Sequence, residues 1–192
     1  GDLQNIVMKV RMVPVSAVFN RFPRMVRDVS KELGKEINLT IEGEETELDR
    51  TVIDEIGDPI MHLLRNSLDH GVESPDAREA KGKPRVGEVG LIARHEGNNV
   101  VIMITDDGAG IDASKIRRKA VEKGMITQDE ADRLDDADAV RLIFLPGFST
   151  AEQITDISGR GVGMDVVRSK IEALSGHVDV ETHIDEGSIF KI

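Results

Sequence analysis

The stretch PIMHLLRNSLDHG, residues Pro59 to Gly71, decides how this chain folds, because it has the pattern of a helix with two unlike faces. At about 100° per residue, one face of such a helix is apolar and would pack on a sheet. That face holds Leu63, Leu64, Ser67 and Leu68, and the polar face holds His62, Arg65, Asn66, Asp69 and His70. A solvated helix face is usually filled with Lys and Glu, whereas imidazole, amide and guanidinium groups suit a metal ion or an anion. Helical spacing alone leaves both interpretations open.

The composition indicates one domain of ordinary size, because the chain has 192 residues. It contains no Trp or Tyr and only five Phe, so the core must be built from Val, Ile, Leu and Met. A formal net charge of −11 argues against a general nucleic-acid or anionic-membrane binder, since both ligands favour a basic face. A nucleotide site needs only a local field and is still allowed.

The location of the protein follows from what the sequence lacks. The absence of Cys excludes a disulfide framework, a Cys-ligated zinc site and a thiol nucleophile, and it agrees with a cytoplasmic protein. No apolar run approaches the length of about 18 residues that a membrane span needs, and no charged-then-apolar leader opens the chain. We therefore expect a cytoplasmic protein without membrane insertion.

Periodicity elsewhere in the chain predicts further helices and strands. Helical patterns cover residues 19–33, 49–70 and 164–174, with an acidic and weakly apolar helical pattern over 112–142. Strand patterns cover residues 37–41, 86–94 and 99–105, and a last hairpin turns at 185–187. Gly57, Asp58 and Pro59 favour a break in the second helix. Residues 72–85 are interpreted as a charged loop.

These elements predict an α+β fold, a two-layer α/β sandwich in which helices cover one face of a mixed, mostly antiparallel sheet. The alternation of apolar and polar residues in the strands favours a sheet with one solvated face over a doubly wound sheet. We expect a linker over residues 1–14 and one domain over residues 15–192. The last strand pattern runs to the final residue, so the chain is interpreted as a piece of a longer protein.

The segment DDGAGID, residues 106–112, follows directly on the apolar strand 99–105. Asp106 at the strand end can accept a hydrogen bond, while Gly108 and Gly110 let bare backbone approach a flat ligand. A plain acidic turn explains the same residues. A calcium loop of the EF-hand type fails, because the third and fifth positions lack Asp or Asn and the twelfth lacks Glu.

Three alternating glycines in GRGVGMDVV, residues 159–167, precede a predicted helix. Bare backbone amides and the positive end of a helix together form an anion site. The spacing does not fit a Rossmann or Walker motif, and a flexible hinge explains the glycines equally well. The neighbouring FLPGFST, residues 144–150, is typical of a segment anchored at two aromatic residues.

Two other kinds of catalytic site do not fit the sequence. A Ser-His-Asp triad has no G-x-S-x-G segment to support it. His62 and His70 are two helical turns apart, which is too far for a shared zinc ion. His62 and Asn66 are one turn apart and can share one ion, and an amide oxygen there suits Mg²⁺.

Taken in order, these motifs resemble the GHKL ATP-binding superfamily, which includes the ATPase domains of gyrase, the heat-shock chaperone and mismatch-repair proteins and the histidine kinases. HLLRNSLDHG resembles the N box, DDGAGID and GRGVGMDVV resemble the two glycine boxes, and FLPGFST resembles the F box. The closing GSIF, residues 187–190, stands where the superfamily has G-T-x-F, so Ser188 replaces the usual Thr. Four motifs in a fixed order are far more specific than any single one.

Within the superfamily, the chain is most similar to the catalytic domain of the bacterial chemotaxis histidine kinases, the CheA family. The likeness covers nearly the whole chain, and it is carried by residues 11–73, by AKGKP at 80–84 and by SGRGVGMDVV at 158–167. It implies a Mg·ATP-binding module of two-component signal transduction. Such a module transfers the γ-phosphoryl group of ATP to a histidine on a separate phosphotransfer domain.

The resemblance also implies roles for individual residues. Asn66 would hold Mg²⁺, with His62 beside it as a second ligand or polar partner. Asp106 would accept a hydrogen bond from the adenine amino group, and Gly110 would line the base. The catalytic side chains would be His62, Arg65 and Lys115. The other ATP-binding residues would be His70, Gly108, Gly159, Arg160, Gly161, Val162, Gly163, Met164 and Ser188, and residues 112–158 would form the ATP lid.

One departure from the superfamily concerns the position four residues before the metal-binding asparagine. The ATP-hydrolysing members have a Glu there, which activates water, and this chain has His62. A neutral imidazole acceptor already carries a lone pair on its attacking nitrogen, so it needs no strong base. The missing carboxylate therefore favours a kinase, in which transfer rests on positioning, Mg²⁺ and cationic side chains.

The resemblance implies partners that act on or alongside this module. They are the histidine phosphotransfer domain of the same kinase, acting in trans, a coupling protein, chemoreceptors and a downstream response regulator, with no nucleic acid. The chain alone is expected to be monomeric, because it has no dimerisation hairpin. Two alternatives stay open: a nucleotide-driven switch of the gyrase or chaperone kind, against which His62 argues, and a regulatory module that binds nucleotide without chemistry.

Overall fold

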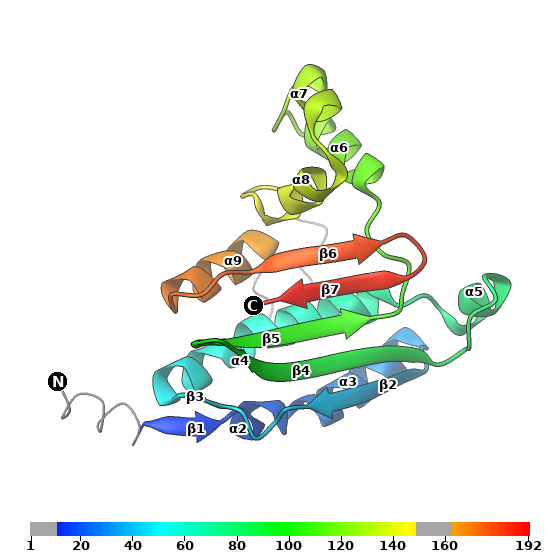
Figure 1. Ribbon diagram of the computed structural model, residues 1–192. Helices are drawn as coiled ribbons and strands as arrows, with labels where there is room; N and C mark the ends of the chain where they lie inside the picture. The colour runs from blue at the N-terminus through cyan, green and yellow to red at the C-terminus, as the bar shows by residue number, and fades with distance from the viewer. Residues whose placement is uncertain (1–10, 149–162) are drawn as a thin grey trace.

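A five-stranded sheet forms one layer of the molecule in the computed structural model, which describes residues 11–148 and 163–192 (Figure 1). In spatial order its strands are β2 (Ile37–Glu42), β4 (Gly87–Glu96), β5 (Asn99–Asp106), β7 (Gly187–Lys191) and β6 (Asp179–His183). The β2–β4 pair is parallel and the other three pairs are antiparallel. The predicted mixed, mostly antiparallel sheet is thus confirmed.

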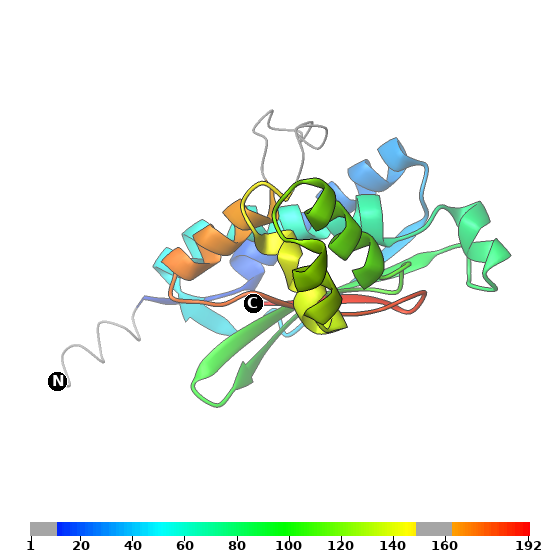
Figure 2. The same ribbon diagram turned by 90° about the horizontal axis from the view of Figure 1, so that it is seen from above.

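The second layer consists of helices that lie on one face of this sheet (Figures 1 and 2). They are α3 (Phe22–Leu33), α4 (Arg50–Asn66) and α9 (Met164–Ala173), preceded by the single turn α2 (Ser16–Phe19). The predicted end of the first helical pattern at residue 33 is confirmed, because Gly34 adopts a positive φ of 66° and ends α3. The predicted two-layer α/β sandwich is confirmed as well.

The core lies between the two layers, and α4 contributes its apolar face to it. Leu63, Leu64 and Leu68 are completely buried, as the helical phase predicts. From the sheet, alternate residues of two central strands meet them. These residues are Val89, Leu91, Ile102 and Ile104. Burying aliphatic side chains of this size stabilises the fold by about 1.5–3 kcal/mol each, so α4 is held firmly on the sheet.

The helix α4 departs from the prediction in two places. The expected break at Gly57–Pro59 is wrong, because α4 runs without interruption from Arg50 to Asn66 with Pro59 inside it. The irregularity comes later instead, where Ser67–Gly71 form a π-helical turn, η1. π-Turns widen a helix locally and occur mostly at functional sites. The ammonium group of Lys35, from the loop after α3, donates to the carbonyl oxygens of Leu68 and Asp69 at 2.7 and 2.8 Å.

Three short elements were not expected from the sequence. The strand β1 (Met12–Pro14) pairs with β3 (Glu47–Asp49), so the end of the predicted linker takes part in a small second sheet. The charged segment 72–85, interpreted as a loop, contains the helix α5 (Pro75–Ala80). The hydroxyl of Ser74 accepts from the backbone N–H of Ala77 and caps this helix.

The predicted lid is helical over its described part. It comprises α6 (Ala113–Glu122), α7 (Gln128–Arg133), α8 (Asp136–Arg141) and the 3₁₀ turn η2 (Leu142–Phe144). Figure 1 shows these helices stacked beyond the β6 edge of the sheet. Arg117 holds α6 to the start of α8, because it donates to Leu134 O and pairs with Asp136, the first residue of α8. Within the described ranges, no helix is both long and apolar enough to cross a bilayer.

Candidate functional site

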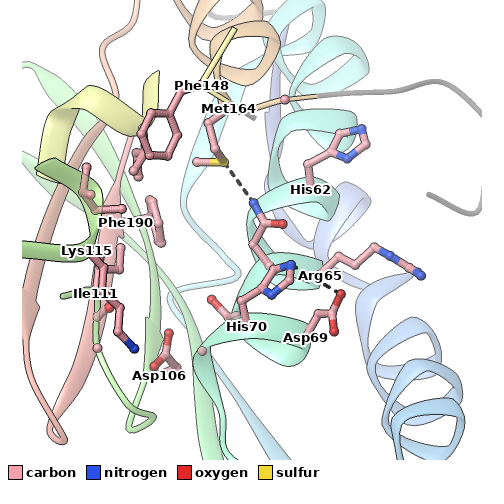
Figure 3. Close-up of a pocket in the computed structure, with 18 of the residues that line it drawn as sticks. His62, Arg65, Asp69, His70, Asp106, Ile111, Lys115, Phe148, Met164 and Phe190 are labelled. Carbon is pink, nitrogen blue, oxygen red and sulfur yellow. Dashed lines mark hydrogen bonds and ion pairs between the residues drawn. The ribbon is translucent and has the colours of Figure 1, made fainter. Parts of the chain in front are cut away.

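A cavity of about 380 Å³ opens between the polar face of α4 and η1 on one side and α6 on the other. This volume lies within the range of about 300–1,000 Å³ that is usual for small-molecule sites. Figure 3 shows His62 and His70 on one side of the cavity, Lys115 and Phe148 on the other, and Asp106 at one end. Ten of the residues singled out from the sequence line it: His62, Arg65, Asn66, His70, Asp106, Gly110, Lys115, Gly163, Met164 and Ser188.

Asp106 forms one end of the cavity, where β5 terminates. The pairing of β5 with β7 fixes its position, because Asp106 lies opposite Ser188 in this register. The residue is only 8% exposed, and one carboxylate oxygen accepts from the backbone N–H of Gly108 at 2.9 Å. Burial raises the pKa of Asp106, and the N–H group of Gly108 opposes this shift. A buried acceptor in this place suits a neutral donor such as an exocyclic amine.

The two glycines after Asp106, Gly108 and Gly110, have different structural roles. Gly108 packs behind the cavity, because a Cβ there would lie 1.9 Å from the carbonyl oxygen of Gly71 in η1. The same carbonyl accepts from Ala109 N at 2.9 Å. Gly110 lines the cavity with a φ of +75°, and a Cβ there would lie 2.4 Å from His183 O. The predicted binding role of Gly108 is therefore indirect in this geometry, whereas Gly110 faces the ligand space.

The α4 wall presents Asn66 and His62, one helical turn apart. The side-chain amide of Asn66 donates to the Sδ atom of Met164, the first residue of α9, at 2.9 Å. Thioether sulfur is a weak acceptor, so this contact is easily exchanged for a better one. In the described ranges, no group of three or more His, Cys, Asp or Glu could hold a metal ion. Mg²⁺ at Asn66 would fit nonetheless, since this ion commonly takes one or two protein ligands together with phosphates and water.

Two other residues of the polar face lie less deeply in the cavity. His70 is 3.5 Å from the carboxylate of Asp69, and both side chains are largely exposed. Arg65 belongs to the lining, but in Figure 3 its side chain points away from Lys115 and Asp106 toward α3. Its Nη1 atom is buried and has no hydrogen-bond partner within the described part of the chain. The predicted catalytic role of Arg65 is thus not matched by its orientation.

The wall opposite α4 carries cationic and aromatic groups from the lid. Lys115 and Lys119 of α6 both line the cavity. Lys119 lies 4.9 Å from the ring centroid of Phe148, which also lines it. Sequence reasoning missed Lys119, although the four-residue spacing from Lys115 places both on one face of a helix. Gly159, Arg160, Gly161 and Val162 lie outside the described residues.

Comparison with known families identifies this arrangement. Residues 55–192 match the family described as histidine kinase-, DNA gyrase B-, and HSP90-like ATPase. The chain belongs to this ATPase family. The predicted membership in the GHKL superfamily is confirmed, and the buried Asp106 and the polar face of α4 are parts of a domain of this kind.

Two curated relatives match the chain along its whole length. The chain is 60% identical over 192 residues to the chemotaxis protein CheA of Bacillus subtilis. This match covers 100% of this chain and 29% of that protein. It is 53% identical over 191 residues to the sensor histidine kinase CheAY of Helicobacter pylori, covering 100% of this chain and 24% of that protein. The predicted resemblance to chemotaxis histidine kinases is confirmed. The chain spans less than a third of the length of these relatives.

A solved structure of a histidine kinase catalytic domain shares the fold. The catalytic domain of histidine kinase ThkA, in a nucleotide-free form, matches with a TM-score of 0.51 and 16% identity. The match covers 94% of this chain and 90% of that one. At this identity the likeness concerns the fold alone, and it agrees with the α/β sandwich described above.

Proposed function

We propose that this chain is the Mg·ATP-binding catalytic domain of a chemotaxis histidine kinase. It would transfer the γ-phosphoryl group of ATP to a histidine on a separate phosphotransfer domain. The observation that carries the proposal is the cavity itself, which has a buried carboxylate, Asp106, at one end and Asn66 and Lys115 facing it from opposite walls. The similarity to CheA and CheAY, which extends over the whole of this chain, supports a kinase function.

The Asp106 end suits adenine. The carboxylate can accept from the exocyclic amino group, while Gly110 leaves room for the flat base beside it. Guanine presents a carbonyl oxygen at the corresponding edge, and an acceptor facing an acceptor is unfavourable. The site would therefore select adenine nucleotides.

The other end suits a triphosphate and its magnesium ion. Asn66, with His62 beside it, would hold Mg²⁺, and Lys115 would neutralise phosphate oxygens. His70 and Met164 complete this lining, and Gly159, Gly161 and Gly163 would wrap the phosphates. Ser188 lines the cavity at the Asp106 end, opposite Asp106 in the strand pairing. When bound, Mg²⁺ would stabilise the charge that develops on the transferring phosphoryl group.

The residues of the chain would contribute position and charge to the reaction. Lys115 would bind the phosphates, and His62 stands where ATP-hydrolysing members of the superfamily keep the Glu that activates water. An incoming imidazole brings its own lone pair, so orientation in line with the leaving group is the main requirement. This difference favours transfer to histidine over hydrolysis.

The partners follow from the same proposal. A histidine phosphotransfer domain of the same kinase would present the acceptor in trans, and a coupling protein and chemoreceptors would control the reaction. A response regulator would receive the phosphoryl group in the cytoplasm. The names of the relatives, chemotaxis protein and sensor histidine kinase, support this assignment.

One assay separates the proposal from its alternatives. The chain is mixed with Mg²⁺ and ATP labelled on the γ-phosphate, with and without a purified phosphotransfer domain from a CheA. We expect acid-labile, base-stable label on the added domain. Release of free phosphate alone would instead indicate a nucleotide-driven switch of the gyrase or chaperone kind. Nucleotide binding without either product would indicate a regulatory module.

A further inference from the structure

The charged segment after η1 forms a buried cluster behind the adenine end of the cavity. Arg78 of α5 is completely buried. Its guanidinium donates to Glu73 Oε1 at 3.1 Å, to Asp107 Oδ2 at 3.0 Å and to Pro84 O at 2.7 Å. Lys83 joins the cluster through Glu73 Oε2 at 2.8 Å. A completely buried arginine is rare unless it is paired, so this cluster has a definite geometry.

The cluster reaches the peptide that follows Asp106. Lys83 Nζ donates to Asp107 O at 3.0 Å and to Gly108 O at 2.9 Å. Arg78 Nη1 also donates to Asp107 O, at 3.3 Å. Two cations therefore converge on one backbone carbonyl, directly beside the residue that ends the cavity.

The charges of the cluster are mutually supporting. Burial acts to raise the pKa of Glu73, but hydrogen bonds from Lys83 and Lys81 outweigh it and hold the pKa below its usual value. Glu73 is therefore ionised at neutral pH, and its side chain is only 7% exposed. This carboxylate holds the ammonium group of Lys83, which also donates to the Asp107 and Gly108 carbonyls.

The position of Lys83 has a consequence for Asp106. The Asp107 carbonyl and the Gly108 N–H belong to the same peptide group, and this N–H donates to Asp106 Oδ1 at 2.9 Å. A cation on the carbonyl oxygen polarises the peptide and strengthens donation from its N–H. Lys83 thus acts on one oxygen of the Asp106 carboxylate through one peptide bond.

We propose that Lys83, held by Glu73 and Arg78, is a positioning residue that sets the selectivity of the site for the adenine base. It orients the Asp107–Gly108 peptide so that one oxygen of Asp106 is occupied and the other is aimed at the ligand. The proposal rests on the assignment of Asp106 as the adenine acceptor and extends it to residues that do not touch the nucleotide.

The test uses Lys83→Met, with Lys81→Met as the matched control. Lys81 belongs to the same cluster, because it pairs with Glu73 at 3.3 Å and with Asp185 at 2.7 Å. Among the hydrogen bonds of the described residues, however, it makes none to the Asp107 or Gly108 carbonyls. Both variants remove one lysine from the cluster, but only Lys83→Met removes the hydrogen bonds to the Asp107 and Gly108 carbonyls.

Binding of adenosine and of inorganic tripolyphosphate is measured for each variant by calorimetry. We expect Lys83→Met to raise the Kd of adenosine about fivefold to tenfold, the effect of weakening one charge-assisted hydrogen bond, with tripolyphosphate unchanged. The Gly108 amide proton should also move upfield in the NMR spectrum of Lys83→Met. Lys81→Met should leave adenosine binding and this resonance unchanged.

Lys83→Arg and Lys83→Gln extend the test in case the methionine variant folds poorly. The arginine keeps a cation near the carbonyls and should retain most of the adenosine affinity, whereas the glutamine should lose it. Equal losses for adenosine and tripolyphosphate, or equal behaviour of the Arg and Gln variants, would overturn the inference. If Asp106→Asn leaves adenosine binding intact, the proposed adenine site itself is wrong, whatever the Lys83 variants show.

Discussion

The two ends of the cavity are built in different ways. The base end, which we define as Asp106, Gly108 and Gly110, lies where β5, β7 and η1 meet and is fixed by main-chain hydrogen bonds. The phosphate end, defined as His62, Asn66, Lys115 and Met164, is assembled from side chains on α4, α6 and α9. The base end is thus held by the sheet and η1, whereas the phosphate end is formed by side chains from three separate helices.

This difference suits the two parts of a nucleotide. A flat, neutral base gains most from a rigid and desolvated slot, in which each hydrogen bond discriminates strongly. A triphosphate brings its own charge and metal ion, so it needs cations and amide oxygens that can adjust to it. Changes at the base end should therefore alter selectivity, and changes at the phosphate end should alter transfer and dependence on salt.

The largest effect is expected from Asn66→Ala. Without its amide oxygen the proposed Mg²⁺ site loses its main protein ligand, so the rate of Mg²⁺-dependent transfer to a phosphotransfer domain should fall about 100-fold or more. The fold should survive, because Asn66 lies on the polar face of α4 and its hydrogen bond goes to a thioether. Circular dichroism checks the fold. Normal transfer by this variant would disprove the metal assignment.

Asp106→Asn tests the base end and should have the next largest effect. The amide would present a donor or a weaker acceptor to the amino group, so the affinity for ATP and adenosine should fall about 10- to 100-fold, as expected for a hydrogen bond to a charged group. Tripolyphosphate affinity should hardly change. Equal losses for adenosine and tripolyphosphate would contradict the adenine role.

The same variant makes a prediction about pH. Since burial raises the pKa of Asp106, the folded state binds a proton more readily than the unfolded chain does. The stabilisation by protonated Asp106 is complete below the unfolded pKa of about 3.9 and is lost as the pH rises through the folded value. Asp106→Asn has no titrating carboxyl group at this position, so its stability does not fall in this way as the pH rises. Urea unfolding should show the variant gaining stability relative to the original chain between pH 4 and pH 7, and no relative gain would contradict the raised pKa.

A smaller effect is expected from Lys115→Met at the phosphate end. The exposed ammonium group lines the cavity from α6, so its loss should raise the Kd of Mg·ATP about threefold to tenfold at low salt. The difference should shrink at 0.5 M salt, where charges are screened within about 4 Å. Arg118→Met is the control, because Arg118 is exposed on the same helix outside the lining. Equal effects of both variants would indicate a general charge effect.

The smallest effect is expected from Met164→Leu. The two side chains have similar volumes, but leucine cannot accept the hydrogen bond that Asn66 gives to Met164. Within the described residues, Asn66 would then have no side-chain hydrogen bond to exchange when Mg·ATP binds, so the Kd should fall, by less than about threefold. A weaker affinity for Mg·ATP in this variant would show that the contact supports the bound state instead.

The sequence was sufficient for the parts of the fold with strong periodicity. The two faces of α4 and the strands β4 and β5 follow from apolar spacing, the last hairpin follows from its turn at 185–187, and the structure confirms them. Asp106 and Asn66 could be located because motifs in a fixed order surround them. Their roles rest on a resemblance, since spacing alone left a solvated face and a plain turn as alternatives.

Other features could not be found in this way, for physical reasons. The π-turn at Ser67–Gly71 preserves the apolar pattern of an α-helix and is specified by its contacts, including those of Lys35. Pro59 favours a break on sequence grounds, although a long helix packed on the core can tolerate the loss of one hydrogen bond. Arg78 and Lys83 looked like solvated loop charges, and only their tertiary partners show that they are buried or clamped.

The contact between Lys35 and η1 also determines how far the domain can be shortened. The family match begins at residue 55, yet Lys35 holds the wall of the cavity, and β2 covers the outer edge of β4 by parallel pairing. A truncated chain that keeps only the matched segment would expose an unpaired strand edge and leave two carbonyls of η1 without their donor. We therefore expect the smallest unit that folds and binds nucleotide to include α3 and β2, which support the site although they contribute no residue to its lining.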